Sequence, residues 1–110
     1  MEFRISGLAV DTTADALVRA LSERWSVREK GDDELRLYGG AATLSIYVDR
    51  ATPSGTHDWL LGGVTTKAQD ESEAFVKELG ARLEEAGIGH RFELSRVGET
   101  EPCFVLEHLR

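Results

Sequence analysis

Apolar and polar side chains alternate along several short stretches of the chain, and this period of two is typical of half-buried β-strands. The clearest case is the segment 41–49, in which Leu44, Ile46 and Val48 share one face. Comparable stretches predict further strands over 3–10, 26–30, 34–38, 57–65, 90–97 and 103–109. The pair Gly39-Gly40 predicts a two-residue hairpin connection, and Ser6-Gly7 predicts a bulge in the first strand.

Two other segments repeat their apolar residues at helical spacing. The first starts at Ala14, with Asp11 or Thr12 expected as its N-cap, and includes Trp25 at its end. The second runs from Asp70, which is expected to be its N-cap, to about Ala86, and Gly87 should end it. The predicted order of elements is therefore βαβββ followed by βαββ.

This order predicts an α+β fold with a mostly antiparallel sheet and both helices on one face. A length of 110 residues fits a single domain over 1–110. The turn-rich segment 50–56 marks its midpoint.

The two helices also suggest an internal duplication. Residues 15–21 align with 73–79 without a gap, and both segments place an acid four residues before a base. The halves of such a repeat would be 1–50 and 57–110. The alternative is that two amphipathic helices converged on one pattern.

The strands over 57–65 and 103–109 are apolar on both faces. Two helices cannot easily cover both faces of these strands. We therefore expect curvature of the sheet, a second subunit or a ligand to cover the second face, unless the strands are simply central in the sheet.

The charge balance excludes some classes of partner. The chain has 13 Lys and Arg against 20 Asp and Glu, a net charge of −7. Such an acid excess argues against nucleic acid and against an anionic membrane surface. Cys103 is the sole cysteine, which excludes an intrachain disulfide, and no secretory signal follows Met1. We expect a cytoplasmic protein.

Catalytic motifs are missing from the sequence. It contains neither a phosphate-binding loop nor a nucleophile elbow, and no cofactor is expected. The histidines do not form a local chelating pair, because strand neighbours point to opposite faces. A metal site would have to combine His57 and Glu107 across strands.

The order of elements and the segment 98–102, an acidic turn ending in proline before the last strand, resemble the vicinal-oxygen-chelate superfamily. That superfamily includes glyoxalase and bleomycin-resistance proteins. The resemblance implies that His57 and Glu107 occupy the metal-ligand positions of the second half. The first strand has Arg4 and Ser6 where the family has His, Gln or Glu, so the implied ligand set is incomplete.

Acidic residues that no helical pattern explains concentrate in two turns. These residues are Asp32, Asp33, Glu34, Glu99 and Glu101. We expect them to bind a protein partner with a basic surface. The protein would then be an inhibitor, immunity or adaptor module without catalytic activity. The alternative is that the net charge only keeps a small domain soluble.

Two further hypotheses come from other residues. A small-molecule-binding or metal-dependent enzyme-like domain would use a pocket on the sheet face lined by Tyr47, His57 and Trp59. A structural homodimer would instead pair its apolar sheet faces.

Overall fold

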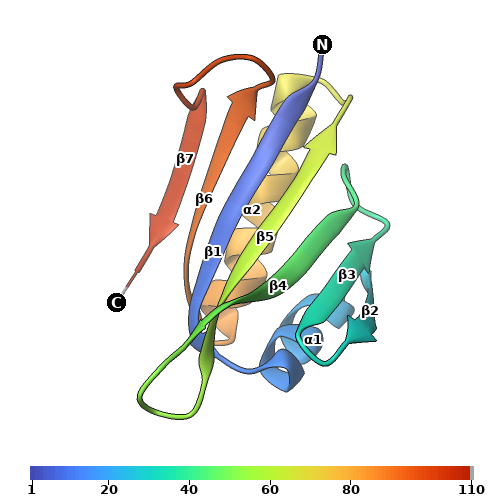
Figure 1. Ribbon diagram of the computed structural model, residues 1–110. Helices are drawn as coiled ribbons and strands as arrows, with labels where there is room; N and C mark the ends of the chain where they lie inside the picture. The colour runs from blue at the N-terminus through green and yellow to red at the C-terminus, as the bar shows by residue number, and fades with distance from the viewer. Residues whose placement is uncertain (110) are drawn as a thin grey trace.

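The computed structural model describes residues 1–109 and contains the nine elements that the sequence pattern predicts, in the predicted order (Figure 1). The helices are α1 (Ala14–Ser22) and α2 (Gln69–Glu85). The strands are β1 (Phe3–Thr12), β2 (Ser26–Gly31), β3 (Glu34–Tyr38), β4 (Leu44–Ala51), β5 (His57–Thr65), β6 (Gly89–Arg96) and β7 (Phe104–His108).

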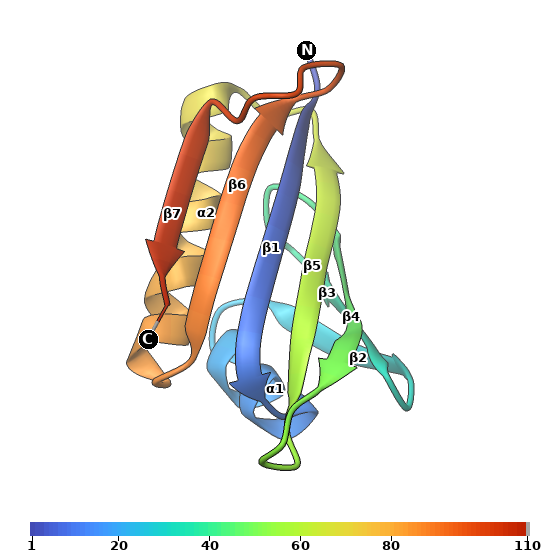
Figure 2. The same cartoon turned by 60° about the vertical axis from the view of Figure 1, so that its left-hand side comes forward.

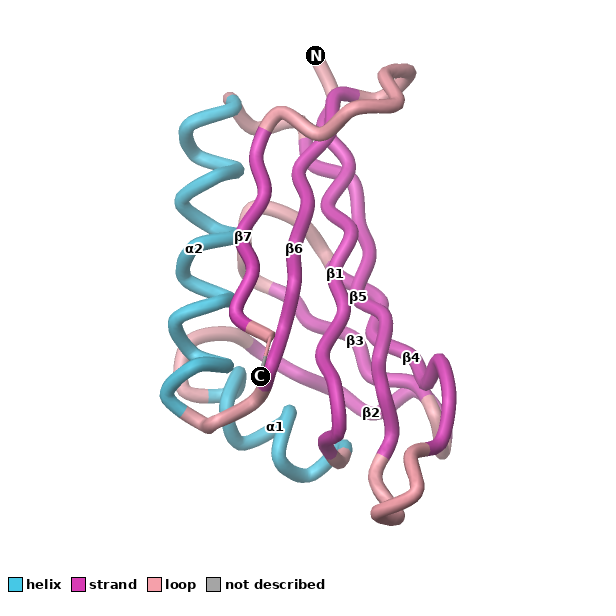
Figure 3. Tube along the Cα trace, turned by 90° about the vertical axis from the view of Figure 1, so that its left-hand side faces the viewer, coloured by secondary structure: helices cyan, strands magenta, loops and turns pink. Residues whose placement is uncertain are grey.

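All seven strands form one antiparallel sheet in the order β2-β3-β4-β5-β1-β6-β7. Both helices pack on the same face of this sheet and contact one another (Figure 3). The predicted α+β class, the antiparallel sheet and the placement of the helices are therefore confirmed. The core lies between this face and the helices, and the other face of the sheet carries no helix.

The first strand keeps its register at Ser6-Gly7, so the bulge predicted there is wrong. Phe3, Ile5 and Gly7 all face the core in an unbroken alternation. Gly7 is required because the ring of Phe92 covers it: a Cβ at this position would lie 2.4 Å from that ring. The irregularity of β1 lies instead between Ala9 and the end of the strand.

Both helix starts differ from the prediction. Thr13 caps α1, and its hydroxyl accepts the backbone N–H of Ala16 at 3.1 Å. Ala68 occupies the N-cap of α2, where no side chain caps the helix, and Asp70 lies inside the first turn. Propensity alone therefore did not locate the start of α2, because tertiary packing overrides weak capping preferences.

The connection between β3 and β4 spans residues 39–43 rather than the two residues expected for a hairpin turn. Gly40 packs directly against Phe75 of α2, where a Cβ would lie 2.2 Å from the ring. Trp25 lies beyond the end of α1, and its ring meets the Phe75 ring edge-on at 5.5 Å. The longer loop therefore serves to close the core over the sheet.

The two halves of the chain enter the sheet differently. After α1 the chain reaches the edge strand β2 and returns inward through β3 and β4, whereas after α2 it enters at β6 and moves outward to β7. Moreover, β1 of the first half lies between β5 and β6 of the second. The duplication stays a hypothesis about the helical segments, since the strand order does not repeat.

Of the two strands with two apolar faces, β5 lies at the centre of the sheet and β7 at one edge. In β5, Trp59 and Leu61 are buried under the helices, while Leu60 is half-buried and Val64 is exposed on the open face. In β7, Val105 is likewise exposed. The described residues leave this second face accessible. Neither helix within residues 1–109 has the length and apolar character needed to cross a bilayer.

Candidate functional site

A hollow of about 290 Å³ opens at the end of the sheet where α1 begins. Five parts of the chain form it: the first turn of α1, the turn between β2 and β3, strand β4, the loop between β4 and β5, and the start of β5. We call it the acidic groove. Its lining consists of Thr13, Ala14, Asp15, Asp32, Asp33, Val48, Gly55, His57 and Trp59.

The helix start positions one carboxylate of the groove. Thr13 caps α1, which fixes the direction of its first turn, and Asp15 follows within that turn. A carboxylate at a helix N-terminus is stabilised by the helix dipole. Asp15 therefore lies at the groove in a position where the helix dipole favours an acidic side chain.

The tight turn between β2 and β3 positions the other two carboxylates. Gly31 ends β2 with a positive φ angle, and Asp32 and Asp33 follow as exposed residues. The backbone carbonyl of Asp33 accepts the N–H of Val48 at 3.1 Å, which ties the turn to β4. The acidic turn is thus fixed against the sheet.

A network of hydrogen bonds around Asp11 holds the far wall of the groove. Asp11 has a left-handed backbone, with φ of +52°, and its carboxylate accepts hydroxyl hydrogen bonds from Thr52, Ser54 and Thr56. The hydrogen bonds from Thr56 and then Ser54 lower the pKa of Asp11. The loop between β4 and β5, which brings Gly55 to the groove, is therefore tied to the end of β1.

Asp58 also holds the end of β1 in place, through a hydrogen bond to the backbone of Asp11. The Asp58 side chain is 8% exposed, and it accepts hydrogen bonds from Arg50 Nε at 2.8 Å and from the backbone N–H of Asp11 at 2.9 Å. The hydrogen bond from Arg50 and then that from Asp11 lower the pKa of Asp58. The residue is thus a structural carboxylate whose charge is already paired, and it does not line the groove.

The acidic groove carries only negative formal charge. Asp15, Asp32 and Asp33 line it, no Lys or Arg does, and none of the three joins an ion pair within the part of the chain that the structure describes. His57 meets the buried Trp59 edge-on at 6.3 Å. The groove can therefore receive a cation at its acidic wall and an apolar stem beside the two rings.

The structure divides the acidic residues predicted to bind a partner into three places. Asp32 and Asp33 line the acidic groove, and Glu34 pairs with Arg36 at 3.2 Å. Glu99 and Glu101 lie between β6 and β7, at the end of the sheet where β1 begins, which is opposite to the groove (Figure 1). The two acidic turns therefore cannot form one continuous surface.

The residues of the predicted sheet-face pocket are also divided. His57 and Trp59 both line the acidic groove. Tyr47 is 46% exposed, and its register partners across β3 and β5 are Glu34 and Leu60. Tyr47 and Trp59 thus lie on opposite faces of the sheet, because Leu60 and Trp59 are strand neighbours.

The predicted metal pair His57 and Glu107 is not brought together. His57 begins β5, whereas Glu107 lies in β7, and β1 and β6 separate the two strands. Glu107 instead lies 3.8 Å from Arg91. Over residues 1–109, no three His, Cys, Asp or Glu side chains are grouped as a metal ion would require.

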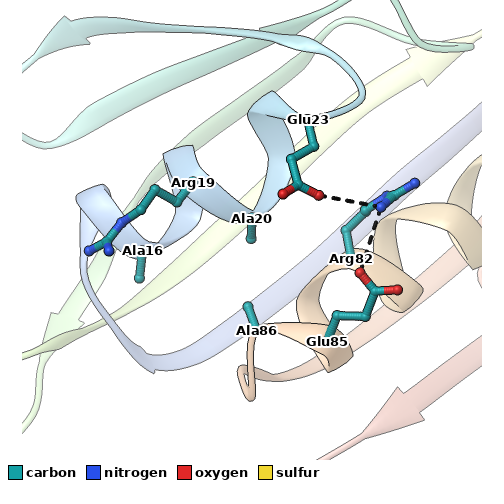
Figure 4. A pocket seen from close by; sticks show the side chains of 7 residues that line it. All are labelled: Ala16, Arg19, Ala20, Glu23, Arg82, Glu85 and Ala86. Atoms are coloured by element: carbon teal, nitrogen blue, oxygen red, sulfur yellow. Dashed lines mark ion pairs between the residues drawn. The ribbon is translucent and has the colours of Figure 1, made fainter.

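A second hollow, of about 420 Å³, lies between α1 and the end of α2 (Figure 4). Alanines from both helices form its floor, and Arg19, Glu23, Arg82 and Glu85 surround it. Arg82 lies 3.5 Å from Glu23 and 3.6 Å from Glu85. The basic and acidic side chains around this hollow balance in charge, so it favours neither a cationic nor an anionic ligand.

Sequence reasoning missed the contribution of Asp15 and the network around Asp11. The acid-before-base spacing predicts a helical ion pair between Asp15 and Arg19, but no such pair is present among the described residues. The three hydroxyl residues Thr52, Ser54 and Thr56 were a usable signal, since each hydroxyl can donate a hydrogen bond to a carboxylate.

Comparison of the chain with models of known protein families, with curated proteins and with solved structures found no match. The resemblance to the vicinal-oxygen-chelate superfamily therefore has no support from these comparisons. The function must be inferred from the geometry and charge of the site.

Proposed function

We propose that this protein is a small acidic binding module, of the inhibitor, immunity or adaptor type, whose acidic groove receives a basic segment of a partner protein. The observation that carries the proposal is the convergence of Asp15, Asp32 and Asp33 on one hollow without a basic residue in its lining. The module acts by occupying its partner rather than by catalysis.

Electrostatics supports a cationic ligand. Two opposite unit charges 4 Å apart attract by about 1 kcal/mol in bulk water and by about 4 kcal/mol at the effective dielectric of a protein surface. Three carboxylates with no neutralising base therefore favour a Lys or Arg side chain over any neutral or acidic group. Complementary charge also accelerates encounter with the partner.

The shape of the hollow favours a side chain of a larger partner. Sites for free small molecules occupy roughly 300–1,000 Å³ and enclose most of the ligand. The acidic groove has about 290 Å³ and is open to solvent at the surface. One or two basic side chains projecting from a protein segment fit this opening.

The proposal is tested with a defined probe, a short peptide rich in Lys and Arg, titrated into the protein by calorimetry at low ionic strength. The triple variant Asp15→Asn, Asp32→Asn and Asp33→Asn should bind at least about tenfold more weakly, if each lost contact costs about 0.5 kcal/mol. Equal binding by the wild type and the triple variant would overturn the proposal.

A matched control separates the site from net charge. The triple variant Glu2→Gln, Glu99→Gln and Glu101→Gln changes the net charge by the same amount at the opposite end of the sheet. It should bind the peptide nearly as well as the wild type. Equal weakening in both variants would mean that only the overall charge attracts the peptide.

A free organic cation is the second candidate ligand, favoured by the His57 and Trp59 rings beside the carboxylates. The same titration with a polyamine distinguishes the candidates. Saturable binding of the polyamine that is stronger than that of the peptide, and lost in the groove variant, would select the small-molecule function.

A further inference from the structure

The two edges of the sheet differ in how they are protected against pairing with another strand. Strand β2 forms one edge and β7 the other (Figure 2). Strand β2 carries Arg28, Glu29 and Lys30 and has a register shift before Gly31. Charges and irregular register are common means by which proteins block an edge strand. The β2 edge is therefore poorly suited to pair with a further strand.

The β7 edge is less protected than the β2 edge, because it carries one acidic residue, Glu107, and no register shift. Its sequence is Phe-Val-Leu-Glu-His, and its pairing with β6 runs without a shift from Phe104 to His108. Val105 is 42% exposed beside this edge. Within residues 1–109 the strand has a partner on one side only, so one row of its backbone groups is free to pair.

We propose that β7 pairs antiparallel with β7 of a second copy of this chain, about a twofold axis at Leu106. This pairing would join the two sheets into one and bring the two α2 helices side by side. It does not depend on the acidic groove, which opens beside α1.

The symmetry of charges on α2 supports this partner and this register. Lys77 Nζ lies 5.5 Å from the centre of the Phe104 ring, and Glu84 Oε1 lies 3.9 Å from His108 Nε2. Phe104 precedes Leu106 by the same number of residues by which His108 follows it. Antiparallel pairing about Leu106 therefore places Phe104 of one copy opposite His108 of the other. Lys77 of each copy therefore faces Glu84 of the other.

The centre of the proposed seam is apolar. Leu106 lies against Gly80 of α2, where a Cβ would be 2.3 Å from the leucine side chain. Gly80 is thus at the level of the axis, midway along the helix between Lys77 and Glu84. A second copy would find an apolar centre flanked on each side by opposite charges, which is the pattern of a self-complementary interface.

The oligomeric state is tested by sedimentation equilibrium from about 5 μM to about 500 μM protein, a range that covers weak homodimers. We expect a dimer at the upper concentrations. Hydrogen exchange at both ends of the range locates the interface. Protection should increase with concentration at Phe104–His108 and stay constant at Ser26–Gly31, the opposite edge.

Charge reversal tests the register. Lys77→Glu and Glu84→Lys, made singly, should each weaken dimerisation about fivefold, because two exposed attractive pairs become repulsive. The double variant should restore the wild-type constant within about twofold. Both residues are exposed, so circular dichroism should show the same fold in every variant.

A protein that stays monomeric over the whole range would overturn the proposal. So would a dimer in which β7 gains no protection, or one in which the double variant is as weak as the single ones. The recovery of affinity in the double variant, together with protection of β7, would establish the pairing.

Discussion

Replacement of Asp58 by alanine tests the support beneath the acidic groove. Asp58 is buried and accepts two hydrogen bonds, from Arg50 Nε at 2.8 Å and from the backbone N–H of Asp11 at 2.9 Å. The substitution removes both and leaves the Asp11 N–H without its partner. This loss should weaken the tie between β5 and the end of β1.

The expected loss of stability follows from the exposure of the two donors. The Arg50 side chain is 77% exposed, so its ion pair with Asp58 contributes less than about 1 kcal/mol. A backbone N–H bonded to a carboxylate contributes about 1.5–2 kcal/mol, and an unpaired one is costly. Asp58→Ala should therefore lower the free energy of unfolding by about 2–3 kcal/mol.

Urea unfolding followed by tryptophan fluorescence measures this loss, because Trp25 and Trp59 are both buried in the folded protein. The midpoint should fall by about 1.5 M for a protein of this size. Arg50→Ala should lose less than about 1 kcal/mol. Asp49→Ala, which removes an exposed carboxylate nearby, should lose less than about 0.5 kcal/mol.

The loss should also depend on pH. The hydrogen bonds from Arg50 and Asp11 hold the pKa of Asp58 below its ordinary value, so the charged carboxylate stabilises the folded state. This contribution is complete above about pH 4 and is lost as the pH falls through the lowered pKa. The difference between wild type and Asp58→Ala should be constant from neutral pH to about pH 5 and narrow below about pH 4.

Two results would refute this reasoning. A loss below about 0.5 kcal/mol at neutral pH would show that the buried hydrogen bonds do not contribute as the geometry implies. A difference that grew with acidity would contradict the sign of the pKa shift.

Further predictions concern packing and helix starts. Gly7→Ala should lower the free energy of unfolding by about 1–3 kcal/mol in thermal unfolding, because the new Cβ would collide with Phe92. Gly62→Ala, whose Cβ would meet no atom closer than 3.9 Å, should change it by less than about 1 kcal/mol. Similar losses in both variants would contradict the role given to the Phe92 contact. Thr13→Ala should cost about 1 kcal/mol through loss of the α1 cap, and Ala68→Ser should gain up to about 1 kcal/mol at the uncapped start of α2. No change at either position would show that capping does not limit these helices.

Local periodicity predicted most of the fold. Alternation over short segments located the strands, because most of them bury one face against the core. It failed where a contact distant in sequence determined the local structure. The pair Ser6-Gly7 predicted a bulge because Gly7 interrupts the series of apolar side chains that face the core. The ring of Phe92, which covers Gly7, explains why a glycine stands there.

The candidate site was harder to predict because its parts are distant in sequence. The residues Asp32 and Asp33 suggested a protein-binding turn, and His57 and Trp59 suggested a separate pocket. The strand order places the β2–β3 turn beside the start of β5, so that both sets share one groove. No local pattern contains that strand order, which also separates Glu99 and Glu101 from the same surface.

The most direct test of the proposed function is a map of backbone amide chemical shifts during titration with the basic peptide. The acidic groove predicts saturable changes at residues 13–15, 32–33 and 55–57, which line or adjoin it. Amides of the opposite acidic turn, 98–101, should not change. Changes centred on 98–101, or spread evenly over the acidic surface, would contradict the proposal that the groove is the binding site.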